Sequence, residues 1–154
     1  MLIPLLAAIH VLGVVLWIGG VAFVTIIIFP MIGRMEGSLE KVLFFQGVEH
    51  RFAWIAKLCV VIVGITGVCL LSLTDRWDVL FRQNGIGITI MVLVWTFYVI
   101  VLLFEGRLFK IISKGEAQHD TAKMLFKLNV FHRVVLVLSL LAVVAGVFTE
   151  HGVL

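Results

Sequence analysis

Residues 2–29 read LIPLLAAIHVLGVVLWIGGVAFVTIIIF, and they contain no Asp, Glu, Lys or Arg. A helix that crosses a bilayer needs about 20 mostly apolar residues, so this stretch is long enough to span a membrane. Three further apolar stretches, at residues 52–74, 86–104 and 134–149, are long enough or nearly so. Backbone groups inside a bilayer must be hydrogen-bonded internally. The sequence therefore predicts an all-α integral membrane protein, an antiparallel four-helix bundle.

The composition indicates the same class of protein. Hydrophobic residues make up 62% of the chain and charged residues 14%, whereas a soluble domain has about 25% charged residues. Four spans and their three connections occupy all 154 residues, which predicts a single transmembrane domain over residues 1–154. The net charge of +3 does not indicate nucleic-acid binding, because the basic residues flank membrane segments. The partner that the composition predicts is the lipid bilayer.

The distribution of basic residues predicts the orientation of the spans. Nine Lys and Arg residues lie at the membrane side reached after the first and third spans: Arg34, Lys41, Arg51, Arg107, Lys110, Lys114, Lys123, Lys127 and Arg133. Only Arg76 and Arg82 lie at the opposite side. Basic residues accumulate in cytoplasmic connections. We therefore expect a multi-pass protein of a bacterial-type inner (plasma) membrane, with both termini on the external side.

Four histidines lie on or beside the predicted spans, namely His10, His50, His132 and His151. Ionisable side chains at membrane depth are unfavourable, which makes them candidates for function. His132 and His151 are separated by 19 residues, or about 28 Å of helix at 1.5 Å per residue. This spacing predicts a cytoplasmic pair, His50 with His132. It also predicts an external pair, His10 with His151.

Two imidazoles from different helices are the axial ligands of many b-type haems, so the pairs predict one or two haem b groups. Arg51 and Arg133 directly follow the two cytoplasmic histidines and are candidates to neutralise haem propionates. Lys57 lies about 10 Å deeper than His50 along the helix. It could pair with a propionate or a quinone oxygen, or extend back to the lipid headgroups.

One face of the first span carries His10, Gly13, Trp17 and Gly20, at positions i, i+3, i+7 and i+10. Glycine on such a face lets another helix or a flat cofactor approach closely. We regard all four as candidate cofactor-binding residues. Plain helix packing, with His10 hydrogen-bonded to a neighbouring helix, is the alternative that the sequence leaves open.

The same residues form the pattern H-x2-G-x3-W-x-G-G from His10 to Gly20. This pattern resembles the first helix of four-helix membrane families related to copper-resistance protein D, and that of HemJ-type protoporphyrinogen oxidases. The second apolar stretch resembles the second helix of the copper-resistance protein D group. The resemblance is carried by Arg51-Phe52, the sequence WIAK at residues 54–57 and the sequence GITG at residues 64–67. The resemblance implies an inner-membrane protein linked to copper uptake or to haem and porphyrin redox chemistry, with His10 as the residue that carries over best.

The function we predict is that of a small b-type haem protein that carries electrons within or across the bilayer, with iron held by the four histidines. Its partner would be a quinone or a redox protein, and a homo-oligomer is left open. One alternative is a copper permease in which the histidines bind copper in transit, although copper(I) favours sulfur ligands. Others are a haem-containing HemJ-like oxidase and a cofactor-free subunit that anchors a partner. The sequence leaves open whether the protein is an enzyme.

Overall fold

The computed structural model describes residues 1–82, 85–113 and 121–151, and within these ranges the regular elements are helices, with no strand. The elements are α1 (Leu2–Phe23), the π-helical segment η1 (Val24–Ile28), α2 (Phe29–Arg34), α3 (Ser38–Leu73), the 3₁₀ segment η2 (Trp77–Phe81), α4 (Ile86–Ser113) and α5 (Thr121–Glu150). The predicted all-α fold class is thus confirmed. Four of the helical stretches are long and apolar enough to cross a membrane: Leu2–Arg34, Leu39–Leu73, Ile86–Phe104 and Ala122–Thr149.

The first long helix is continuous from α1 through η1 to α2, and it contains Pro30. Proline lacks the N–H that would bond to the carbonyl of the residue four positions earlier. The π-helical turn lies immediately before this proline, and such a local widening lets a helix continue past the missing bond. The chain then leaves the helix at Met35, whose backbone is extended, and α3 begins at Ser38.

Two helices begin earlier than the hydropathy pattern predicts. The second apolar stretch was expected from residue 52, but α3 begins at Ser38. The fourth was expected from residue 134, but α5 begins at Thr121. The physical reason is that hydropathy marks where charged side chains begin, whereas backbone hydrogen bonding continues as long as no proline or glycine break intervenes. Both extensions bury apolar side chains, including Phe45 and Met124.

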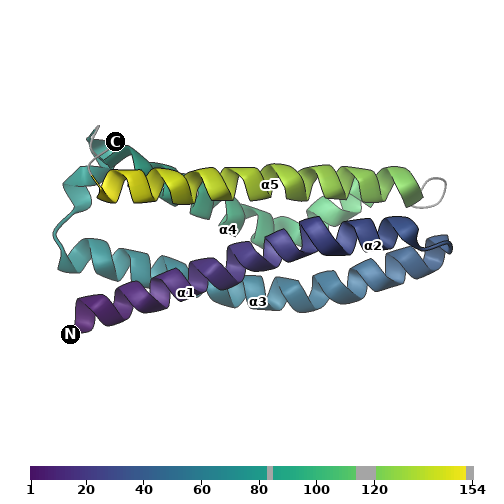
Figure 1. Ribbon diagram of the computed structural model, residues 1–154, viewed down its shortest axis with the longest axis horizontal. Helices are drawn as coiled ribbons and strands as arrows, with labels where there is room; N and C mark the ends of the chain where they lie inside the picture. The colour runs from purple at the N-terminus through teal and green to yellow at the C-terminus, as the bar shows by residue number, and fades with distance from the viewer. Residues whose placement is uncertain (83–84, 114–120, 152–154) are drawn as a thin grey trace.

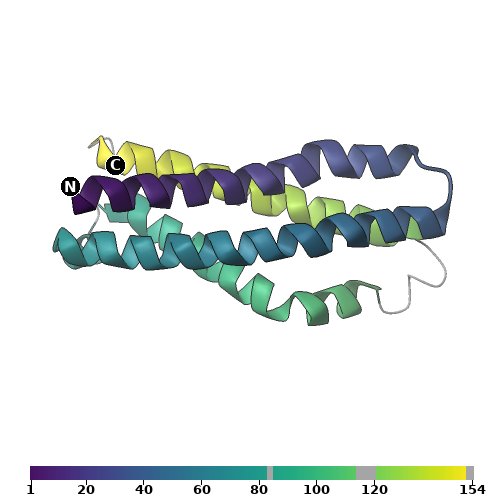
Figure 2. The same ribbon diagram turned by 90° about the horizontal axis from the view of Figure 1, so that it is seen from below.

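The long helices lie lengthwise beside one another, and the beginning of α1 and the end of α5 lie at the same end of the molecule (Figures 1 and 2). The most extensive packing joins α1 to α3 and α4 to α5. Contacts of α1 with α5 and of α3 with α4 are less extensive. The fold is therefore built from two tightly packed helix pairs that touch each other over smaller surfaces.

Two buried clusters fill the space between the helices. The central cluster consists of Trp17, Val21, Ala56, Cys59, Val60, Val63, Tyr98, Val135 and Leu136. The second lies nearer the α2–α3 turn and consists of Val24, Ile28, Phe29, Ile32, Phe45, Met124, Leu125 and Leu128. At the central cluster, the hydroxyl of Tyr98 lies 3.0 Å from the hydroxyl of Ser139 and links α4 to α5. The partly buried His132 on α5 contacts Phe29 and Phe45 of the second cluster, and His10 on α1 is also partly buried.

Candidate functional site

His10 lies on α1 and contacts α3. Its Nδ1 is 2.9 Å from Oγ1 of Thr66, and that hydroxyl donates its proton to the carbonyl of Ile62 at 2.7 Å. A hydroxyl has only one proton to donate, so the Nδ1–H of His10 must be the donor to Thr66. In a neutral imidazole this leaves a lone pair on Nε2. His10 is therefore held in the tautomer that can bind a metal ion through Nε2.

The rest of the His10 face packs against other helices. A Cβ atom added to Gly13 would lie 2.9 Å from Cγ2 of Val63 on α3, and one added to Gly20 would overlap the ring of Phe52. The two glycines therefore allow α3 to pack closely against α1. This is the plain helix packing that the sequence left open as the alternative to a cofactor site. Trp17 is buried with its ring edge-on to that of Tyr98, at 4.2 Å between centroids. Its indole N–H has no acceptor among the described residues.

His132 lies on α5 in an aromatic environment. Its ring centroid is 5.2 Å from that of Phe29, 6.4 Å from that of Phe45 and 5.8 Å from that of Phe131. The Nδ1–H donates to the carbonyl of Leu128 at 2.9 Å, because a carbonyl can only accept. Nε2 again carries the lone pair. Both partly buried histidines are therefore oriented by a hydrogen bond through Nδ1.

The other two histidines are exposed. His50 follows Phe45 by five residues on α3, a rotation of about 140° at 100° per residue, so it points away from the side on which Phe45 meets His132. The Nδ1–H of His151 donates to the carbonyl of Val147 on its own helix, at 2.9 Å. In the described part of the chain, no hydrogen bond or ring contact joins His50 to His132, and none joins His10 to His151.

The cationic candidates occupy different environments. Arg51 and Arg133 are exposed, and the Nε–H of Arg133 donates to Oδ1 of Asn129 at 3.1 Å. Lys57 is partly buried on α3. Arg133 is thus held on the surface of α5 one residue beyond His132, at a position from which a guanidinium could pair with an anion.

Sequence reasoning missed Thr66 as the partner of His10, although a hydroxyl within an apolar helix was a usable signal. Serine and threonine side chains commonly form hydrogen bonds between membrane helices. It also missed Phe29 and Phe45 around His132, because the positions of aromatic residues within apolar stretches do not indicate which residues of other helices they contact. No group of three or more His, Cys, Asp or Glu side chains suited to a metal ion lies within the described ranges.

Comparison with known proteins adds no relative: no protein-family model matches the chain, and no curated protein and no solved structure matches it either. The chemistry of the two partly buried histidines is therefore the basis for a functional proposal.

Proposed function

We propose that this chain is a multi-pass protein of a bacterial-type inner membrane, an antiparallel four-helix bundle with both termini outside. It binds b-type haem through His10 and His132 and carries electrons across the bilayer. The resemblance of its first helix to the HemJ-type and copper-resistance protein D families is part of the proposal.

Membrane insertion is supported by the apolar outer surface. Leu12, Leu58 and Leu103 expose 61%, 59% and 74% of their surfaces, on three different helices. Soluble monomers rarely expose continuous apolar patches of this kind. In a bilayer the same side chains contact lipid tails. The excess of basic residues at one end of the molecule supports the orientation.

The observation that carries haem binding is the fixed tautomer of both histidines. A histidine that binds a metal usually donates its other ring N–H to a carbonyl, carboxylate or water, which orients the ring and raises its basicity. His132 does so to the carbonyl of Leu128, and His10 donates instead to the hydroxyl of Thr66. His10 and His132 would therefore be the residues that hold the haem iron. Haem, when bound, supplies reversible one-electron exchange.

The two histidines serve different sites. Phe29 contacts His132, and His10 precedes Phe29 by 19 residues on one continuous helical stretch, or about 28 Å. No single iron can bind both. Two haems, each with one protein imidazole and lying near opposite ends of the molecule, suit electron transfer across a membrane. In this arrangement Arg133 is the cation best placed to pair with a propionate of the His132 group.

The test is a reduced-minus-oxidised absorption spectrum of the detergent-purified protein, with haem counted as the pyridine haemochrome. We expect two haems per chain, and one after either His10→Ala or His132→Ala. His50→Ala and His151→Ala are the matched controls, and both should keep two haems because these histidines are exposed and outside the two sites. A colourless protein made with adequate haem supply, or full haem content in both His10→Ala and His132→Ala, would refute the proposal.

A further inference from the structure

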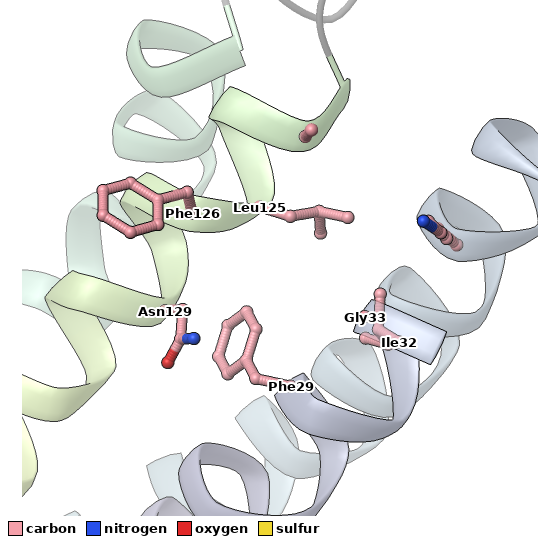
Figure 3. Close-up of a pocket in the computed structure, with 8 residues that line it drawn as sticks. Phe29, Ile32, Gly33, Leu125, Phe126 and Asn129 are labelled. Atoms are coloured by element: carbon pink, nitrogen blue, oxygen red, sulfur yellow. The ribbon is translucent and has the colours of Figure 1, made fainter. Parts of the chain in front are cut away.

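A cavity of about 290 Å³ lies between α2, α3 and α5, and it is partly open to the surface. Figure 3 shows Phe29 and Ile32 on one side of it and Leu125 and Phe126 on the other. These four side chains give the cavity an apolar lining. Gly33 also lines it and offers no side chain, which keeps the space open.

Two polar groups face this apolar lining. Lys41 lines the cavity, and no hydrogen bond or ion pair engages its ammonium group within the described residues. Asn129 also lines it, and its Oδ1 accepts the Nε–H of Arg133. The amide nitrogen of Asn129 is thus left to donate elsewhere, and Figure 3 shows it on the side of the Phe29 ring. The cavity therefore offers one positive charge and one neutral donor, which together favour an anion.

The cavity lies at the depth of lipid headgroups in the proposed membrane orientation. Gly33 is in the last turn of α2, and Lys41 is in the first turn of α3, so both are next to the turn that joins these helices. Arg34 in α2 and Lys123 and Lys127 in the first two turns of α5 also lie at this end of the molecule. On α5, the exposed apolar side chains of Phe126, Val130 and Val134 follow one another at intervals of four residues away from the cavity. An apolar path therefore leads from the cavity toward the bilayer interior.

We propose that this cavity binds the phosphate of an anionic phospholipid, with an acyl chain along Phe126, Val130 and Val134. Lys41 and the Asn129 amide donate to the phosphate oxygens. Basic cavities between membrane helices on the cytoplasmic side are suited to acidic lipid headgroups. This lipid site rests on the proposed membrane insertion but not on haem binding. A failure of lipid binding would therefore leave the haem proposal intact, and a failure of haem binding would leave the lipid site intact.

Lipid binding to the intact, detergent-purified protein can be titrated by native mass spectrometry with phosphatidylglycerol and with phosphatidylcholine. Gly33→Leu should fill the cavity without a clash, because a Cβ at Gly33 meets no atom within 4 Å. Gly47→Leu is its matched control, since Gly47 is equally open and does not line the cavity. Lys41→Gln removes the charge, and Arg107→Gln, an exposed arginine on α4, is the control with the same change in net charge.

We expect wild type and both controls to prefer phosphatidylglycerol over phosphatidylcholine by about ten-fold, the value of roughly one charge-assisted hydrogen bond. Gly33→Leu and Lys41→Gln should lose this preference while keeping the haem content and thermal stability of wild type. Equal lipid preference in all five proteins would overturn the proposal. Displacement of the lipid by millimolar inorganic phosphate would also overturn it, because the cavity would then be a site for the free anion.

Discussion

The hydrogen bond between His10 and Thr66 gives the sharpest quantitative prediction, because it joins two helices through residues 56 positions apart. Thr66→Val removes the hydroxyl and nearly preserves the side-chain shape. The carbonyl of Ile62 loses the Thr66 hydroxyl but keeps the main-chain N–H of residue 66, four positions on in the same helix. The carbonyl of Val63, 3.2 Å from the same hydroxyl, also loses it, and the Nδ1–H of His10 loses the Thr66 oxygen as its acceptor.

The expected loss of stability follows from the removal of the hydrogen bond between His10 and Thr66. A hydrogen bond contributes about 0.5–1.5 kcal/mol net in proteins, and bonds between membrane helices average about 0.6 kcal/mol. His10 is only partly buried, which limits the penalty of an unsatisfied N–H. We therefore expect Thr66→Val to lower the free energy of unfolding by about 1 kcal/mol. Thr66→Ser keeps the hydroxyl and should retain most of the interaction.

A double-mutant cycle of Thr66→Val with His10→Ala measures this interaction directly. The free energy of unfolding of each variant can be obtained by titrating the protein in mild detergent with a denaturing detergent and following far-UV circular dichroism. We expect a coupling of about 0.5–1 kcal/mol between the two positions. Additive effects, with a coupling below about 0.3 kcal/mol, would show that the hydrogen bond does not hold His10 to α3. Equal destabilisation by Thr66→Ser and Thr66→Val would lead to the same conclusion.

Two further predictions use the same detergent titration. Gly64→Leu should lower the free energy of unfolding by about 1–3 kcal/mol, because a Cβ at Gly64 would lie 2.5 Å from the ring of Trp95. Gly19→Leu, where a Cβ meets no atom within 4 Å, should change it little, and equal effects of the two would contradict this packing. Tyr98→Phe should lower it by about 1 kcal/mol, since it removes the bond between the Tyr98 and Ser139 hydroxyls. An unchanged value in Tyr98→Phe would mean that this bond contributes nothing net.

The candidate site was predictable only in part. The position of each histidine along its helix followed from counting residues, and His132 lies beside Phe29 and Phe45 of the second cluster. Their pairing with other histidines also depends on how each helix is rotated about its axis. His50 lies on the outward side of α3, and the His151 ring bonds to its own helix, so neither contacts its expected partner among the described residues.

The bounds of the helices were likewise predictable only in part. The apolar stretches were confirmed as helical, because a long apolar stretch can be recognised from the residues of that stretch alone. The additional turns from Ser38 and Thr121 lie outside the apolar stretches, and their continuity with the spans depends on packing around Phe45 and Met124. Short helical segments in proteins draw most of their stability from tertiary contacts.

By itself the sequence determined the helical class, the four apolar stretches, the asymmetry of basic residues and the position of each histidine along its helix. These properties are sums over neighbours along the chain, so they can be read without knowing what lies opposite. Only the tertiary structure decided that His10 meets Thr66, that Phe29 and Phe45 surround His132, and that Lys41 and Asn129 line one cavity. Those contacts depend on the rotation and crossing of helices far apart in the chain, which close packing of side chains selects and no local pattern encodes.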